Sequence, residues 1–450
     1  MKLDRRRMLT SLAATALGAP LLPFTAVAAS SPAPTRHRPL RTPQGSVDWE
    51  AVRALFPLSP EWTHLASFLL VSHPRPVAEA IEHFRKKIDA DPVWVEIAAL
   101  TDSEGRPFAA VKQAIAEYIG GQANEICMTS NTTTALAMAY HGLRIRGDQD
   151  ILTTEHDHYS HHESIRYAAA RSGARVRHVA LYDRAATADA TQMVERVARA
   201  IRPTTRAVGV TWVHSSTGVK LPIAELAAVV ARANRGRTDA DRCLLIVDGV
   251  HGFGAQDADV ARLGCDFFAS GLHKWMFAPR GTGFLWGKSD AWRHARPTIP
   301  AFDPDGMVTW EAWMNREPLP PTQAAFVSPG GFLAFEHFLA IPAAFEWHRT
   351  IGRDQIASRI DELSTAFKEG ASKIRGVTLH TPRDPRLSAG ISCFEVAGLS
   401  AEAMTQRLTA KKFRTTSSPY KTSYARVATG VMNTPAEIER VLRAIREIAT

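Results

Sequence analysis

The chain has 450 residues, of which 45% are hydrophobic and 22% charged, and its formal net charge at pH 7 is +9. This is ordinary globular composition, long enough for two domains or for one large domain with an appendage. Basic residues are scattered among acidic ones without a basic stripe, which argues against nucleic-acid binding. The four cysteines form no CxxC pair, so neither a zinc site nor a disulfide framework is indicated.

The first 29 residues predict a twin-arginine signal peptide. Arg5 and Arg6 precede the moderately apolar stretch LAATALGAPLLPFTAVAA, which contains the small-residue exit Ala26-Val27-Ala28. A disordered basic tail is the alternative, but such a tail would not carry the apolar block. We therefore expect export by the twin-arginine machinery to the periplasm or medium, without a stable membrane anchor. Residues 30–45 are rich in proline and basic residues and predict a flexible leader.

From about Glu125 onward, strand-like runs alternate with helical patterns. The strand-like runs are EICMT, DILTT, ARVRHVAL, TRAVGVTWV, CLLIVDGV, CDFFAS and TGFLW, and the helical patterns between them include TTTALAMAYHGL, ESIRYAAARSG, TQMVERVARAI and IAELAAVVARAN. Strand followed by helix, repeated this often, predicts an α/β fold with a mainly parallel sheet covered on both faces. We assign this large domain to residues 106–330.

After residue 330 the pattern changes to that of a smaller α+β domain. A long helical stretch over 331–371 leads into the strand-like runs VTLHT, GISCFEV and ARVATG, and an amphipathic helix, PAEIERVLRAIREI, closes the chain. We assign this small C-terminal domain to residues 331–450. We expect the N-terminal segment, residues 46–105, to pack against it.

Polar side chains gather where predicted strands end, which is where open α/β sheets bind ligands. Thr132 and Thr133 open a predicted helix, whose first backbone amides could hold a phosphate, although a polar N-cap is the commoner explanation. Asp248 ends the apolar strand LLIV, and His251 follows three residues later. Such an acid could pair with a protonated ring nitrogen, cap a helix or bind a metal.

Two further strand ends carry hydroxyl, imidazole and amine groups. VHSSTG places Ser215 after a strand, and SGLHKWMFAPRGTGFLWG places Ser270, His273 and Lys274 after another. A lysine among small and apolar residues is expected to have a lowered pKa, which leaves more of the nucleophilic neutral amine. A phosphate cradle, a strand-end acid and this lysine together predict an imine-forming lysine that holds pyridoxal 5′-phosphate.

In these residues the chain resembles the class V aminotransferase group of fold-type I pyridoxal-phosphate enzymes, and GLHKWMFAPRGTGFLWG is similar to its isopenicillin N epimerase-like branch. The resemblance covers roughly residue 60 to the C-terminus. It implies a homodimer with active sites at the subunit boundary. It also implies that Lys274 is the Schiff-base lysine and proton carrier, that Asp248 pairs with the pyridine nitrogen, and that His251 lies near the ring oxygen.

The resemblance also assigns the groups around the cofactor and the substrate. His158, with Tyr159 as the next candidate, would stack on the cofactor ring. Ser215 is a candidate for the ring hydroxyl, and Arg426 would receive a substrate carboxylate in a bidentate grip. The phosphate would be held by Thr132, Thr133, Ser270 and His273.

The chain departs from the family pattern in two places. Relatives often have a Gly-Thr pair that reaches the neighbouring subunit's phosphate, where this chain has FVSPGG, so Ser328 is at best a substitute. Cysteine desulfurases of this group need a mobile nucleophilic cysteine in the C-terminal region. The cysteine of this chain's C-terminal region, Cys393, lies in the strand-like run GISCFEV, which disfavours desulfurase chemistry.

A histidine-rich segment supports a rival hypothesis. TTEHDHYSHHES places four histidines between His156 and His162, with acidic residues beside them, and this density could bind a divalent metal in a hydrolase. That hypothesis leaves Lys274 and Asp248 unexplained, so we favour the cofactor and expect no metal. A binding protein that has lost catalysis is a third hypothesis, against which the complete lysine, acid and phosphate set argues.

The sequence does not select the reaction. Transamination, epimerisation and elimination all begin with the loss of the same proton. The expected substrate is an amine or amino acid, and export favours a siderophore or peptide modified in the periplasm.

Overall fold

The computed structural model describes residues 39–101, 107–301, 306–331 and 333–450, so the predicted signal peptide lies outside the described residues. Its central element is a seven-stranded sheet with the strand order β2-β8-β7-β6-β5-β3-β4, and neighbouring strands are parallel except that β8 is antiparallel to both of its neighbours. The strands are β2 (Ile126–Thr129), β3 (Asp150–Thr154), β4 (Arg175–Val179), β5 (Thr205–Thr211), β6 (Leu244–Asp248), β7 (Phe267–Gly271) and β8 (Gly283–Gly287).

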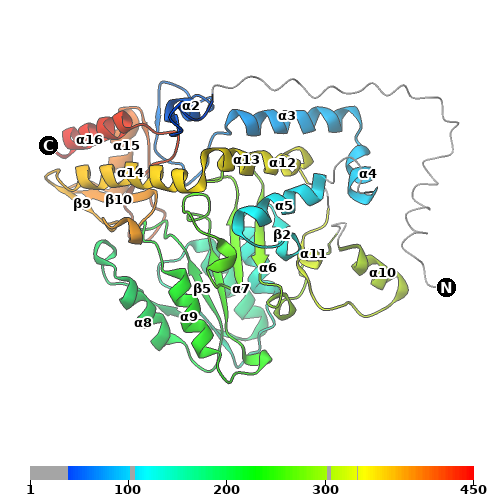
Figure 1. The fold of residues 1–450 in the computed structure, drawn as a ribbon. Coiled ribbons are helices and arrows are strands. Elements are labelled where there is room, and N and C mark those ends of the chain that lie inside the picture. Colours follow the sequence, from blue (N-terminus) through cyan, green and yellow to red (C-terminus); the bar gives the residue numbers. More distant parts are fainter. Residues whose placement is uncertain (1–38, 102–106, 302–305, 332) are drawn as a thin grey trace, which may run out of the picture.

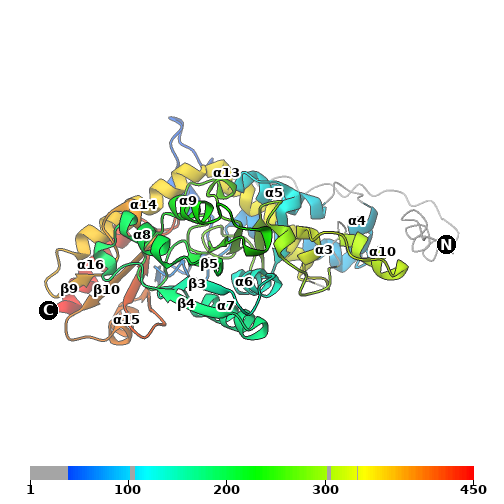
Figure 2. The same ribbon diagram turned by 90° about the horizontal axis from the view of Figure 1, so that it is seen from below.

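Helices cover both faces of this sheet, as Figure 2 shows, with α6 and α7 on one side and α9 and α13 on the other. The strands are apolar on both faces for this reason: along β6, Leu245 and Val247 pack into one core and Leu244 and Ile246 into the other. The large-domain helices are α5 (Pro107–Ile119), α6 (Thr132–Gly142), α7 (Tyr159–Ser172), α8 (Ala190–Ala200), α9 (Ile223–Ala233), α10 (Met307–Asn315) and α11 (Ala324–Val327).

The C-terminal part forms a second, four-stranded antiparallel sheet with the order β12-β13-β10-β9. It lies beside the large domain (Figure 1), together with α14, α15 and α16. The elements are α12 (Phe335–Leu339), α13 (Ile341–Ile351), α14 (Arg353–Ala371), β9 (Val377–Leu379), β10 (Ile391–Val396), α15 (Ala401–Ala410), β11 (Phe413–Arg414), β12 (Thr416–Ser417), β13 (Ala425–Ala428) and α16 (Pro435–Ala449).

The N-terminal segment contacts both parts of the molecule. Its elements are α2 (Trp49–Arg53), β1 (Thr63–His64), α3 (Arg75–Ala90) and α4 (Trp94–Thr101). Strand β1 pairs in parallel with β11, while Val77 of α3 and Trp94 of α4 belong to the core of the large domain. Within the described ranges, no helix has the length and apolarity that a bilayer crossing requires.

The predicted α/β fold, with its mainly parallel sheet and smaller α+β domain, is confirmed. Two local details differ from the prediction. Helix α7 begins at Tyr159 rather than near Glu163, because the His158 side chain caps it by accepting from the Ser160 backbone N–H. The single helical stretch predicted over 331–371 is three helices, and one break falls at Gly352, whose φ of +106° suits a residue without a side chain.

Candidate active site

Lys274 lies in the turn after β7, close to the turn that follows β6. Its Nζ is 3.5 Å from Nε2 of His251. The backbone N–H of Phe277 donates to the Lys274 carbonyl at 3.0 Å, which closes a tight turn around the lysine. Phe277 adopts a left-handed conformation with φ of 54°, which bulky residues rarely do. Where such a conformation does occur, it is often at a functional site.

The Asp248–His251 turn is shaped by close packing at its glycines. A Cβ on Gly249 would lie 1.8 Å from the Phe268 ring, and a Cβ on Gly252 would lie 2.2 Å from the Trp212 ring. Only glycine permits these approaches. The Asp248 side chain is 2% exposed, and its Oδ1 accepts from the Val250 backbone N–H at 3.1 Å.

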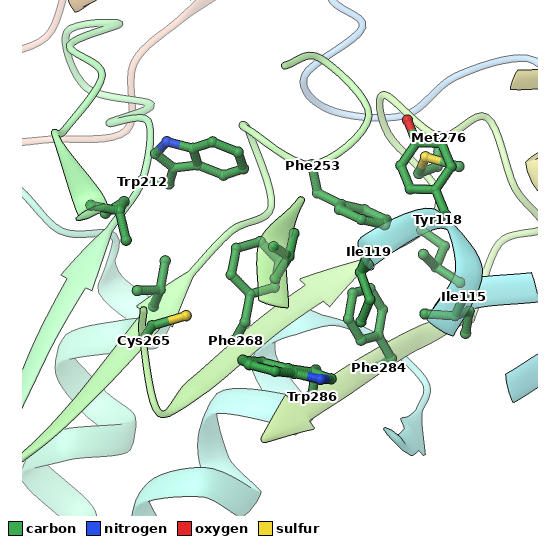
Figure 3. Close-up of a cluster of buried hydrophobic side chains, with 14 of the residues drawn as sticks. Ile115, Tyr118, Ile119, Trp212, Phe253, Cys265, Phe268, Met276, Phe284 and Trp286 are labelled. Atoms are coloured by element: carbon green, nitrogen blue, oxygen red, sulfur yellow. The ribbon is translucent and has the colours of Figure 1, made fainter. Parts of the chain in front are cut away.

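The turns that contain Asp248 and Lys274 both pack on a layer of aromatic side chains. Figure 3 shows Phe253, Phe268, Phe284 and Trp286 packed with residues of α5, and Met276 of the Lys274 turn lies in the same cluster. Phe253 is two residues after His251, and Met276 is two residues after Lys274. The hydrophobic core therefore fixes the backbone on which the acid and the amine are mounted.

Burial favours the uncharged forms of Asp248 and Lys274, whereas the attraction between the two groups favours their charged forms. Burial lowers the pKa of Lys274 to about 8; Asp248 acts to raise it and Arg426 to lower it further. Burial raises the pKa of Asp248 to about 6, although the Val250 N–H and Lys274 act to lower it. Burial also holds the pKa of His251 well below its usual range, so this imidazole is neutral. A buried acid and an amine that is easily deprotonated suit proton transfer near neutral pH.

Three of the four residues expected to hold a phosphate lie around Gly271: Thr132, Ser270 and His273. The Gly271 backbone N–H donates to Thr132 Oγ1 at 2.7 Å, and Ser270 Oγ donates to the Gly271 carbonyl at 3.0 Å. A Cβ on Gly271 would lie 2.9 Å from the His273 ring, so His273 lies against the same glycine. Thr133, the second residue of α6, is exposed. The N-terminus of α6 offers backbone N–H groups that have no partner within the helix.

The small domain contributes Arg426, on β13, and Tyr420, on the loop before it. The Arg426 side chain is buried, and it donates from Nη1 to the Ser215 carbonyl at 2.9 Å, from Nη2 to the Ser417 carbonyl at 3.0 Å and from Nε to Thr416 Oγ1 at 3.2 Å. One hydrogen on each Nη remains for a carboxylate.

Tyr420 joins the two domains at Ser215. Its hydroxyl is 2.7 Å from Ser215 Oγ, and its ring stands edge-on to that of His158 at 6.2 Å between centroids. Sequence reasoning missed Tyr420, because the segment SPYKTSY carries no pattern that distinguishes an inward-facing tyrosine from an exposed one.

The histidine-rich segment does not gather into a metal site. His156 accepts from the Leu181 backbone N–H, His161 meets the Tyr140 hydroxyl at 2.6 Å, and His162 meets the Thr154 carbonyl at 2.8 Å. Among the described residues, no three histidine, cysteine or acidic side chains are grouped as metal ligands would be. His158 caps α7, and burial lowers its pKa, with the charges of Lys274 and Arg426 lowering it further.

Ser328 and Cys393 are both engaged inside the chain. Ser328 is buried, its hydroxyl accepts from the Met128 backbone N–H at 3.3 Å, and the Ala324 carbonyl lies 3.5 Å away. Cys393 is fully buried in β10, and burial raises the pKa of its thiol to about 12.

These residues fit pyridoxal phosphate. Lys274 offers an amine that burial has made easier to deprotonate, Asp248 offers a buried acid, and the helix N-terminus at Thr132 suits a phosphate. His251 Nδ1 is buried and has no hydrogen-bond partner among the described residues, as expected for a group that meets a ligand.

Known proteins share this arrangement of elements. Isopenicillin N epimerase from Streptomyces clavuligerus is 27% identical over 413 residues, which cover 88% of this chain and 98% of the relative. A probable cysteine desulfurase from Xylella fastidiosa is 23% identical over 425 residues, covering 90% and 97%. The solved structure of the cystine C-S lyase C-DES with cysteine persulfide superposes with a TM-score of 0.75 at 22% identity, covering 86% of this chain and 98% of the other. The cysteine desulfurase CsdA from Escherichia coli has a TM-score of 0.74 at 20% identity, covering 90% and 98%.

The family model for "Aminotransferase class-V" matches residues 72–441, which include both domains and every site residue described above. Pyridoxal 5′-phosphate is accordingly the cofactor, and the protein is an enzyme. This chain belongs to the aminotransferase class-V family.

Proposed function

We propose that this enzyme acts on the amino group of a carboxylate-bearing amine, either an amino acid or an exported natural product, with transamination as the first candidate reaction. The observation that carries the proposal is the placement of Lys274, whose Nζ lies 3.5 Å from His251 and whose pKa is lowered to about 8 beside the buried Asp248. An amine with that pKa can both remove and return a proton near neutral pH.

Each group around Lys274 has a distinct task. When bound, pyridoxal phosphate supplies an electron sink that acidifies the C–H bond next to the substrate nitrogen. Asp248 would hold a proton on the ring nitrogen, and the neutral His251 would lie near the ring oxygen. Lys274 Nζ would carry the substrate proton, and the two free Nη hydrogens of Arg426 would orient the substrate carboxylate.

Epimerisation is the second candidate. It is supported by the likeness to isopenicillin N epimerase, which extends over 98% of that relative's length. An epimerase would return a proton to either face of the carbon from which Lys274 removes one. The amino group stays on the substrate, so no acceptor for it is needed. A lyase that tailors a siderophore or peptide is a further possibility under the same first step.

Cysteine desulfuration is disfavoured by the cysteines of this chain. All four are buried, and burial raises the thiol pKa of Cys243, Cys265 and Cys393 to about 12. A thiol with such a pKa is not a thiolate nucleophile at neutral pH.

The reaction can be identified by incubating the holoenzyme with a panel of amines in deuterated water. Mass spectrometry of the substrate distinguishes a keto product (transamination), deuterium uptake without a keto product (epimerisation) and a released fragment (elimination). Amines whose carboxylate is blocked serve as the control for the Arg426 site. Protein that takes up no pyridoxal phosphate, or that exchanges no proton in any amine, would refute the proposal.

We also propose that the enzyme works in the periplasm or outside the cell. The basis is the twin-arginine pattern of residues 1–29. Amino donors and keto-acid acceptors are scarce there, which favours an exported natural product as the substrate.

A further inference from the structure

Asp157 is a buried carboxylate at the centre of the histidine-rich turn. Its Oδ2 accepts three hydrogen bonds, from Thr153 Oγ1 at 2.9 Å and from the backbone N–H and Oγ1 of Thr154 at 2.9 and 2.8 Å. Its Oδ1 accepts from the Thr211 backbone N–H at 2.8 Å. The side chain is fully buried, so these groups replace water around the charge.

The hydrogen bonds require a carboxylate rather than an amide. Each of the two oxygens accepts from a backbone N–H, that of Thr154 for one and that of Thr211 for the other. An asparagine would satisfy one of these donors and direct its own NH₂ group at the second. Burial acts to raise the pKa of Asp157, but these hydrogen bonds and the charges that His161 and His214 take up in acid outweigh it and hold that pKa below its usual range. The chain therefore keeps an ionised group at this position near neutral pH.

Asp157 joins the ends of neighbouring strands at the active-site edge. Thr153 and Thr154 end β3, and Thr211 ends β5, where it is the register partner of Asp248 on β6. The residue after Asp157 is His158, which caps α7. The Asp157 side chain therefore attaches the turn that contains His158 to the end of β5, the strand next to Asp248.

No lysine or arginine among the described residues offsets this charge at close range. The nearest ionisable partners are His161 Nδ1 at 3.9 Å and His214 Nε2 at 3.8 Å, and burial lowers the pKa of these imidazoles to about 4 and about 3, so both are neutral at pH 7. Asp157 adds to the burial that raises the pKa of Asp248. The charge of Asp157 also raises the pKa of four other groups or acts against a lowering of it: His156, Tyr140, Tyr182 and Tyr420.

We propose that Asp157 is a positioning residue of the active site: its buried negative charge strengthens the hold of Asp248 on a proton, and its hydrogen bonds fix the turn that presents His158. When the cofactor is bound, the negative charge of Asp157 would also favour a protonated ring nitrogen that faces Asp248, because an opposite charge nearby stabilises the charged form. The proposal rests on the assignment of Asp248 in the proposed function, but its test uses the full chain freed of cofactor. Failure of the test would leave the assignment of the reaction untouched.

The test is the thermal stability of apoprotein variants between pH 5 and pH 7. Asp248 is mostly protonated at pH 5 and mostly ionised at pH 7, because its pKa is raised to about 6. In the wild type, Asp157 repels the Asp248 charge that forms as the pH rises. Asp157→Asn removes this repulsion, so the loss of Tm that it causes should be largest at pH 5 and smaller at pH 7.

Two controls separate the charge from the hydrogen bonds. Asp150 is a matched buried carboxylate at the opposite end of β3, where it accepts from Thr204, Thr205 and Arg177. Asp150→Asn should lower Tm by the same amount at both pH values. In an Asp248→Asn background, the pH dependence of the Asp157→Asn effect should disappear.

The second readout is the pH at which Asp248 titrates, followed by carboxyl-carbon NMR of labelled apoprotein. Asp157→Asn should lower that pH by roughly one unit, as expected for the loss of one buried like charge. A Tm loss that is the same at pH 5 and pH 7, with the Asp248 titration unmoved, would overturn the proposal. So would failure of both Asp157→Asn and Asp157→Ser to fold while Asp150→Asn folds, because Asp157 would then act in folding alone.

Discussion

The amine of Lys274 sits where burial lowers its pKa to about 8 and the charge of Asp248 keeps it from falling further. Lys274→Ala should therefore abolish turnover, with proton transfer alone accounting for roughly 10²–10⁴-fold. Weak, non-covalent cofactor binding should remain through the phosphate site, and the bound cofactor should no longer be fixed by borohydride. Turnover and borohydride fixation measured on the purified variant test this prediction.

Lys220 is a matched control for Lys274. Burial also lowers the pKa of Lys220, but its Nζ donates to Gln256 at 2.6 Å and does not reach the Asp248 turn. Lys220→Met should retain turnover and borohydride fixation. Equal losses in the two variants, or activity in Lys274→Ala, would contradict the assignment of Lys274.

Arg426 is a buried cation with three contacts to neutral oxygens and with hydrogens left for an anion. Arg426→Lys should raise the KM for carboxylate-bearing substrates by roughly 10-fold or more, because a lysine cannot make the bidentate contact. The KM for the same amine with its carboxylate blocked should change little. Steady-state kinetics on the two substrates distinguish this from general damage, and an equal rise in both KM values would place the carboxylate elsewhere.

At the scale of single elements, the turn after β6 depends on the absence of a side chain at Gly249. Gly249→Ala should destabilise the protein by about 1–3 kcal/mol and weaken cofactor binding, because the new methyl group would lie 1.8 Å from the Phe268 ring. Adding Phe268→Leu opens that space and should restore part of the affinity for pyridoxal phosphate. Thermal unfolding and cofactor titration of the single and double variants check this, and no rescue would mean that the turn fails for another reason.

The same turns show what the sequence can and cannot predict. The strand-end placement of Asp248, His251 and Lys274 follows from apolar runs that stop at polar residues, and the predicted α/β fold follows from the alternation of those runs with helices. Strand β12 has only two residues, too few to show an alternating pattern, although its partner β13 follows closely in the chain. Strand β11 is equally short and forms by pairing with the distant β1, so no local pattern marks it. Tyr420 could not be found for the same reason, since its partner Ser215 is 205 residues away.

The histidine-rich segment shows how composition misleads when the partner of each side chain is unknown. Its density suggested a metal, yet His156, His161 and His162 each contact a different group, and Asp157 is held by backbone and hydroxyl donors. The partner of each side chain depends on helix α7 starting at Tyr159, directly after the His158 cap and four residues before the predicted start near Glu163.

At the scale of the whole molecule, the proposed export depends on Arg5 and Arg6. The twin-arginine route recognises this pair, so replacement of both by lysine should leave the full-length protein in the cytoplasm, still folded and able to bind pyridoxal phosphate. Cell fractionation followed by immunoblotting measures this, and replacement of Arg7 alone is the matched control. Unchanged export of the double variant would contradict the twin-arginine assignment.

The proposed homodimer is best tested where apolar side chains are exposed. Among the described residues between 299 and 333, five large apolar ones are exposed, and Trp313 on α10 has 77% of its surface accessible, the largest value among the exposed large hydrophobic residues of the described chain. An exposed side chain as large and apolar as that of Trp313 is a candidate for an interaction surface, and a second copy of the chain is the partner that the family resemblance implies. Light scattering should give a dimer for the wild type and for Trp313→Phe. Trp313→Glu should shift the population toward monomer, because the carboxylate would lose its water in the interface. A wild-type monomer at micromolar concentration, or a Trp313→Glu dimer of unchanged stability, would show that this surface does not join two subunits.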